Sequence, residues 1–283
     1  MKNFFFYTLS LVSLLINVTN AQELTSNSNK YTAHSQGKFF ISWGGNREIY
    51  SNSDITFRGE DYNFTLHNAQ AHDKPKGWHM DYINPTKMTI PQTNFIMGYF
   101  INDHYSLAIG VDHMKYVMTQ DQTTNIDGYY PNPGSYDELI IGNPNQVVLT
   151  DKFLTFEHTD GLNYVFSEIS RHDDISSLFY IHNTDIIQVN LTEGIGLGAL
   201  YPKTNAKILG KDRHDDFHVS GFGTSIKVGL NFTFFKHFFI QTEAKGGYIN
   251  MSDIRTSRHL SDRASQEFFF LQSIFSIGGI FRI

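Results

Sequence analysis

The chain of 283 residues contains no cysteine and carries a formal net charge of -6 at neutral pH. The lack of cysteine excludes disulfide bridges, thiolate nucleophiles and zinc–thiolate sites. The negative balance argues against a broad nucleic-acid surface, because phosphate binding needs clustered cationic side chains. An apolar content of 40% and a mean hydropathy of -0.30 resemble those of a soluble protein. Overall composition therefore does not reveal a membrane-spanning segment, and the order of apolar and polar residues along the chain has to be examined.

The N-terminus has the plan of a secretory signal peptide. A short positive head is followed by the apolar run Phe4–Val18 and by small residues that end at Ala21. An N-terminal membrane anchor is the alternative, but the run is shorter than the ~20 residues that a spanning helix needs. We therefore predict a signal peptide at 1–21 and one exported domain at 22–283.

Period-two alternation, which is typical of β-strands, recurs through the mature chain. Between Gly221 and Phe234 the even positions are apolar apart from Thr224, and the odd positions are mostly small or polar. An ordinary globular strand has ~5–6 residues, whereas a tilted strand of ~10 or more can cross a bilayer. We predict eight long strands: Lys38–Ile49, Ile90–Ile101, Tyr105–Val117, Leu162–Ser170, Ile186–Ala199, Gly221–Phe234, Phe239–Ile249 and Gln266–Ile283.

The connections between these strands alternate in length. Three are tight, at Ile101–Tyr105, Arg171–Ser177 and Phe234–Phe238, whereas long polar stretches separate the other neighbours. Short turns on one side and long loops on the other are typical of bacterial outer-membrane barrels. The predicted fold class is therefore all-β: an eight-stranded antiparallel transmembrane β-barrel with long extracellular loops and short periplasmic turns.

Two alternatives to this topology stay open. A soluble secreted β-barrel that binds a small ligand would also show alternating strands, although its loops need not sort by length. The stretch Asp54–His67 is also strand-like, and it would make a ninth strand if it crossed the membrane. We interpret it as a β-ribbon within the first long loop.

The chain resembles the small outer-membrane β-barrel proteins of Gram-negative bacteria, most of all the uncharacterised barrels of the Bacteroidota. The resemblance rests on the signal peptide, on "FFISWGGNR" (Phe39–Arg47), on the strand–turn–strand Asn94–Tyr116 and on the last strand. In that family the last strand carries a signal that the barrel-assembly machinery reads. The residues that match this signal are Gly278, Phe281 and Ile283, with isoleucine where the family has an aromatic residue. The resemblance implies an outer-membrane location and an assembly route through periplasmic chaperones and that machinery.

Charged side chains fall on the inward faces of the predicted strands. Side chains just fill the interior of an eight-stranded barrel, so opposite charges can pair there and close the bore. We expect a lumen charge network of Asp112, Glu168, Lys227, Glu243, Lys245 and Arg282. Glu193 falls on the outward face by strict alternation, which is costly in lipid. We expect a β-bulge near Gly194 to turn it inward.

The sharpest candidate for catalysis is the pair His218 and Ser220. Residues two apart on a strand point the same way, so the imidazole and the hydroxyl can act as base and nucleophile. The motif resembles the His-x-Ser of outer-membrane lipid A deacylases, in which a downstream Glu orients the His. No acid stands at that position here, so Asp215, Asp216 or Glu243 would have to replace it. A lipid-modifying hydrolase is thus the alternative function, and no catalytic residue is assigned.

The segment Lys211–His218 also holds carboxylates and imidazoles of the kind that bind divalent ions. Their spacing matches no defined site, and a solvated loop that contacts lipopolysaccharide phosphates through Lys211 and Arg213 is the better interpretation. We expect no metal, no cofactor and no nucleic-acid partner.

The predicted function is structural, or a surface interaction through the extracellular loops. The expected partners are outer-membrane lipid and lipopolysaccharide, and the expected state is a monomer. The fold by itself assigns no activity.

Overall fold

The computed structural model describes residues 34–77, 91–211, 213 and 216–282. The signal peptide predicted at 1–21 lies outside them. The described chain is built from β-strands and one short 3-10 helix, η4 (Ser176–Phe179). Within these ranges we find no helix of the length and apolarity required to cross a membrane.

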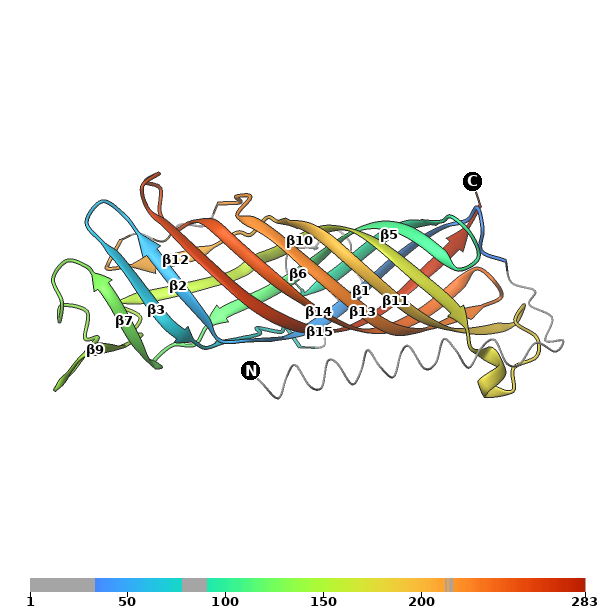
Figure 1. Ribbon diagram of the computed structural model, residues 1–283, viewed down its shortest axis with the longest axis horizontal. Coiled ribbons are helices and arrows are strands. Elements are labelled where there is room, and N and C mark those ends of the chain that lie inside the picture. Colours follow the sequence, from blue (N-terminus) through green and yellow to red (C-terminus); the bar gives the residue numbers. More distant parts are fainter. Residues whose placement is uncertain (1–33, 78–90, 212, 214–215, 283) are drawn as a thin grey trace. The chain divides into compact units, whose positions relative to one another are not determined.

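Eight long strands form a closed antiparallel ring, in which the last strand pairs with the first (Figure 1). Their order around the ring follows the sequence: β1 (Phe39–Tyr50), β5 (Thr93–Phe100), β6 (Tyr105–Met118), β10 (Leu154–Asp174), β11 (Ile187–Leu200), β13 (Gly221–Phe234), β14 (Phe238–Arg255) and β15 (Arg263–Phe281). The register followed around the ring from Phe39 leads back to Ile49, ten residues further along β1. A stagger of this size tilts the strands by about 40° from the ring axis.

The eight predicted strands are confirmed as the members of this ring. Two of the three predicted tight connections are also present, between β5 and β6 and between β13 and β14. The third prediction, a tight turn at Arg171–Ser177, is wrong. Strand β10 continues to Asp174, and the chain then passes through η4 before β11 begins at Ile187.

The alternating side chains give the ring an apolar outer surface, which we call the apolar belt. All eight ring strands contribute large apolar side chains that are at least 40% exposed. They include Ile41, Met97, Leu107, Ile109, Val165, Ile169, Ile195, Leu197, Phe222, Ile226, Phe238, Leu271, Phe275 and Ile277. The intervening residues point inward and are mostly buried, as in the alternating burial along β15.

The long connections fold into a second β-structure at one end of the ring, which we call the cap (left in Figure 1). Its strands are β2 (Ser53–Arg58), β3 (Asn63–Ala69), β4 (Ala71–His72), β7 (Thr123–Tyr129), β8 (Leu139–Ile140), β9 (Asn143–Val148) and β12 (Asn205–Ile208). The first of these pairs with the beginning of β15, and β12 pairs with the beginning of β10. The predicted ribbon at Asp54–His67 is therefore confirmed as a hairpin, β2–β3, outside the eight-stranded ring.

The cap encloses an aromatic core that continues into the ring. Phe57 stacks on Phe64 at 5.3 Å between ring centroids and meets Phe156 edge-on at 5.4 Å. These three side chains are at most 1% exposed. The predicted polar loops are thus a folded unit with its own apolar interior, which stabilises the connections as a group.

A buried histidine makes the cap sensitive to acid. His158 lies on β10 at the cap side of a register shift, which separates it from Leu162. At this shift β10 leaves the apolar belt. Its side chain is fully buried between Tyr116 and Phe156, and its Nδ1 lies 2.9 Å from the Thr204 hydroxyl. Burial lowers the pKa of His158 from 6.5 to about 3.

The free energy of unfolding of the cap should therefore fall as the pH falls below about 6.5. In that range the unfolded chain binds a proton at His158 that the folded chain does not. The free energy of unfolding then falls by up to ~1.4 kcal/mol for each pH unit. Urea titrations at pH 7 and pH 5, with limited proteolysis as the readout, measure this loss. His158→Gln should remove it, whereas the half-exposed His67→Gln should keep it. An unchanged acid response in His158→Gln would contradict the assignment.

Candidate functional site

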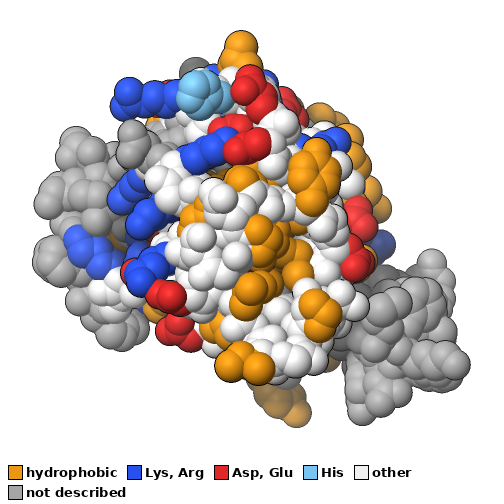
Figure 2. All heavy atoms as spheres, turned by 90° about the vertical axis from the view of Figure 1, so that its left-hand side faces the viewer, with side chains coloured by type: hydrophobic (Ala, Val, Ile, Leu, Met, Phe, Trp, Pro, Cys, Tyr) orange, Lys and Arg blue, Asp and Glu red, His pale blue; other side chains and the backbone are white. Residues whose placement is uncertain are grey.

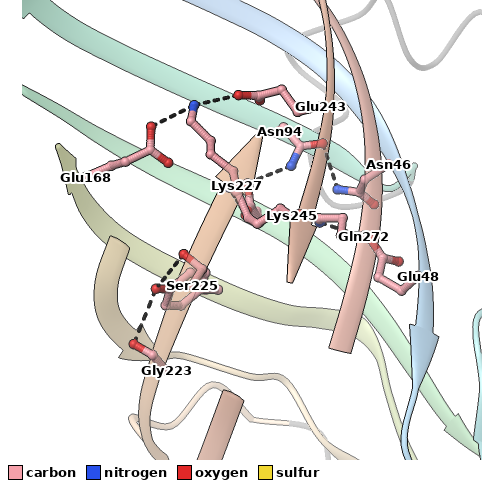
Figure 3. Close-up of polar contacts among 12 residues, drawn as sticks. Asn46, Glu48, Asn94, Glu168, Gly223, Ser225, Lys227, Glu243, Lys245 and Gln272 are labelled. Carbon is pink, nitrogen blue, oxygen red and sulfur yellow. Dashed lines mark hydrogen bonds and ion pairs between the residues drawn. The ribbon is translucent and has the colours of Figure 1, made fainter. Parts of the chain in front are cut away.

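Two buried lysines and three acids form the centre of the ring interior, and Figure 3 labels both lysines together with Glu168 and Glu243. Lys245 Nζ lies 2.7 Å from Asp112 Oδ2, and both side chains are 0% exposed. Lys227 Nζ lies 2.7 Å from Glu168 Oε1 and 2.5 Å from Glu243 Oε1. A charge in a dry interior is tolerated only when a partner compensates it, and each lysine has one.

The two lysines are neighbours in the strand register but pair with different acids. Lys227 and Lys245 are direct neighbours on β13 and β14. Lys227 on β13 bridges Glu168 on β10, two strands away, and Glu243 on the adjacent strand β14. Lys245 instead reaches across the interior to Asp112 on β6 and lies 4.2 Å from the centre of the Phe166 ring. The two cations therefore use separate acids.

A chain of side-chain amides extends the charged centre toward β1. Asn94 donates to Asp112 at 2.6 Å, and Asn46 donates to Asn94 at 2.8 Å. Gln272 donates to Glu48 at 3.0 Å, and Gln92 also donates to that carboxylate. The sequence-based prediction missed Asn46 and Glu48, although both stand at inward positions of the alternation in β1.

Apolar clusters lie on both sides of this charged layer. On the side of the short connections, Phe100, Phe239 and Ile280 form a buried cluster. On the cap side, the Tyr50 ring lies 5.1 Å from Tyr116 and 5.6 Å from Phe268. A buried apolar cluster thus lies on each side of the ion-paired layer, and on the side of the short connections buried polar side chains such as Gln188, Asn231 and Thr233 fill the rest of the interior.

Two expectations for the charged residues are wrong. Arg282 does not join the interior network, because β15 ends at Phe281 and the exposed Arg282 guanidinium donates to the Gln36 carbonyl oxygen at 3.4 Å. No bulge turns Glu193 inward, since its pairing with Arg171 and Val228 is regular. Glu193 stays on the outer wall beside the Arg171 guanidinium, whose opposite charge offsets part of its desolvation.

The structure does not bring His218 and Ser220 together as a base and a nucleophile. His218 Nε2 lies 2.8 Å from Asp253 Oδ2, while the Ser220 hydroxyl donates to the His218 backbone carbonyl at 3.3 Å. Alternation continued back from the outward Phe222 predicts an outward Ser220 as well, but Ser220 is only 2% exposed and precedes β13, which begins at Gly221. The acid beside the imidazole is Asp253, which was not among the three expected.

The loop that precedes His218 makes ion pairs within the cap. Lys211 Nζ lies 3.3 Å from Asp262 and 3.4 Å from Asp61, and it stands 4.6 Å from the centre of the Tyr62 ring. Arg213 lies 3.6 Å from Asp160. Residues 212, 214 and 215 are outside the described part. Among the residues that are described, no group of three or more His, Asp or Glu side chains is placed to hold a metal ion.

Of the three residues that match the assembly signal, the structure describes Gly278 and Phe281. Gly278 is packed so closely that an added Cβ would lie 2.2 Å from the Phe239 ring and 2.5 Å from the Ile41 carbonyl oxygen. Phe281 is 42% exposed and stacks on Phe39 at 6.4 Å. Ile283 lies outside the described residues.

Solved structures that are similar to this chain are outer-membrane β-barrel proteins of Gram-negative bacteria. The outer membrane protein OprG from Pseudomonas aeruginosa has a TM-score of 0.39 and 10% identity, and 89% of this chain and 99% of that chain are covered. The attachment invasion locus protein Ail of Yersinia pestis has a TM-score of 0.28 and 10% identity, with coverages of 85% and 99%. Neisserial surface protein A has a TM-score of 0.28 and 10% identity, with coverages of 84% and 96%.

No protein-family model and no curated protein sequence matches the chain. At TM-scores and identities this low, the structural likeness assigns neither a family nor an activity to it.

Removal of the most deeply buried cation should destabilise the ring. Lys245→Met leaves the Asp112 carboxylate unpaired in the dry interior, which should cost ~3–5 kcal/mol. Urea unfolding of the protein in detergent micelles measures the loss. The matched control is Lys74→Met, which breaks a half-exposed pair with Glu157 and should cost within about 1 kcal/mol. Equal losses in the two variants would contradict a tightly paired interior.

Proposed function

We propose that the chain is an integral outer-membrane β-barrel with a closed lumen, and that it acts structurally or through surface interactions of its cap. The observation that carries this proposal is the inverted distribution of side chains in the ring. Apolar side chains cover the outside on all eight strands, whereas the ion pairs of Lys227 and Lys245 lie inside. In a soluble barrel we would expect the opposite distribution.

The apolar belt supports insertion into a bilayer. Soluble monomers rarely expose contiguous apolar patches of more than a few hundred Å². A closed ring also leaves no unpaired sheet edge, which lipid would penalise because it offers no hydrogen bonds. The soluble secreted barrel is therefore the weaker alternative.

The filled interior supports a structural role over a pore. Water-filled channels occur in barrels with many more strands, while eight strands enclose a space that side chains just fill. Here the charged layer is bounded by apolar clusters on both sides.

The cap is the part of the chain that is available for interactions outside the membrane. In the proposed orientation the short connections face the periplasm and the cap faces outward. Figure 2 shows the cap end, where hydrophobic side chains lie among charges of both signs. Tyr129, Leu139 and Ile141 are exposed on its strands and loops, at 60%, 47% and 103%. Such a mixed surface suits contact with lipopolysaccharide or with another protein.

The proposal includes a route to the membrane. The signal peptide at 1–21 would direct export, and periplasmic chaperones would carry the chain to the barrel-assembly machinery. That machinery would recognise Gly278, Phe281 and Ile283. The proposed state in the membrane is a monomer. A lipid-modifying hydrolase is not favoured, because the Ser220 hydroxyl is bonded to a backbone carbonyl and not to the His218 ring.

The protein should be extracted from membranes only by detergent and should migrate differently on gels before and after heating. Both follow if the closed ring resists unfolding in dodecyl sulfate without heat. Fractionation of cells that express the full chain, followed by unheated and heated electrophoresis, tests this. Recovery of folded protein in the soluble fraction without detergent would overturn the membrane assignment.

The purified protein should give no steady conductance in a planar bilayer, because the ion-paired layer and its apolar neighbours fill the bore. Lys245→Met tests the same point, since a weakened interior should increase brief current fluctuations relative to Lys74→Met. A large, steady conductance of the unmodified protein would contradict the closed lumen.

A further inference from the structure

The connection between β10 and β11 exposes an apolar cluster at the end of the ring opposite the cap. It covers residues 175–186 and contains η4, which is the gold helical turn among the strand ends at the right of Figure 1. Leu178, Phe179 and Tyr180 are 71%, 51% and 86% exposed. The other two connections at this end span only residues 101–104 and 235–237. A longer turn with three exposed apolar residues needs a physical reason.

The turn is fixed against the outer wall of the ring. Val189 belongs to the outward row of β11, together with the exposed Ile195 and Leu197, yet Val189 is only 1% exposed. The Val189 amide donates to the Ser176 hydroxyl at 2.9 Å, and the Ile175 amide donates to the Val189 carbonyl at 2.9 Å. The beginning of η4 therefore covers this outward position. In Figure 1 the η4 turn lies to the side of the strand ends, along the outer wall of the ring.

Outward aromatic residues mark the other strand ends at this side of the ring. They are Phe39, Tyr99, Tyr105, Phe234, Phe238 and Phe281. Neighbours among them touch, with ring centroids 4.9 Å apart for Phe39 and Tyr99 and 6.2 Å apart for Phe234 and Phe238. Strands β10 and β11 interrupt this row. The end of β10 carries the outward ion pair of Arg171 and Asp173 at 2.7 Å, and β11 begins with Ile187.

Two aromatic residues at this edge adopt a backbone conformation that bulky side chains avoid. Tyr180 has a φ of 57° and Phe235 a φ of 52°, both in the left-handed region. Each such residue costs about 1–2 kcal/mol relative to the right-handed conformation. The turn formed by Phe235 and Lys236 has positive φ at both residues, where Asn-Gly is the preferred pair. The Phe235 amide donates to the Ile186 carbonyl at 2.9 Å, so the two turns are joined.

We propose that η4 and Phe235 form an interfacial anchor that lies between the headgroups and the upper acyl chains of phospholipids in the periplasmic leaflet. Rings of aromatic side chains favour this depth in a bilayer. The anchor continues the aromatic row across the two strands whose own ends are charged or aliphatic. Contact with lipid also accounts for the exposure of Leu178 and for the strain at Tyr180 and Phe235. The inference rests on the proposed membrane insertion of the ring.

Tryptophan fluorescence in vesicles with brominated phospholipids tests the anchor. The full chain, with Trp43→Phe and Trp78→Phe, receives one reporter at a time and is folded into phosphatidylcholine vesicles. The reporters are Phe179→Trp in η4, Ile226→Trp in the apolar belt and Tyr129→Trp in the cap. Leu178→Trp replaces the first reporter if Phe179→Trp fails the gel-shift test of folding.

The η4 reporter should be quenched most by bromines near the headgroup, and the belt reporter most by bromines deep in the acyl chains. The cap reporter should be quenched by aqueous iodide alone. Quenching of the η4 reporter by iodide and by no brominated lipid would overturn the anchor and indicate a surface open to a periplasmic protein. Failure of every brominated lipid to quench the belt reporter would instead overturn the membrane insertion itself.

Discussion

The antiparallel ladder between β1 and β15 is the constraint on which the rest of the structure depends. It pairs Phe39 with Phe281 and continues without a break to Tyr50 and Phe270, which turns an open sheet into a ring. An open sheet would expose a row of unpaired amides and carbonyls at each edge. Once the ring is closed, all ring strands have two neighbours, and the only exposed surface of the wall is its side chains. The apolar belt is compatible with lipid for this reason.

Closure also determines what the interior can contain. A stagger of ten residues over eight strands leaves room for side chains and little else, so every inward residue must fit its neighbours. The interior is dry enough that Lys227 and Lys245 each need an acid, and the amides of Asn94 and Gln272 donate to the carboxylates of Asp112 and Glu48. These contacts tie β1, β5, β6, β10, β13, β14 and β15 together across the interior. The sites that can vary are then the cap at one end and the short connections at the other.

The sequence predicted the ring well because alternation is a local signal, and each outward apolar row can be read strand by strand. It predicted the β2–β3 ribbon but not the rest of the cap. There β2 is held by β15, β12 by β10 and β7 by β3, and such pairing is not visible in any single segment. The alternation of inward and outward side chains gave the wrong orientation where strands end. Arg282 follows the last ladder residue, and Ser220 precedes the first residue of β13, so neither keeps the orientation that alternation assigns. The partner of His218 was missed because Asp253 lies 35 residues away on β14.

Strand β15 has a further consequence for the order in which the chain can fold. Its first residues pair with β2 in the cap, and its later residues pair with β1 in the ring, so both ladders join parts of the chain about 200 or more positions apart. Contacts between such distant segments form slowly, because the entropy of closing a long loop is lost before the contacts stabilise it. Neither the ring nor the β2 edge of the cap can be completed before β15 is in place. The ring and the cap therefore share one late folding step, the pairing of β15.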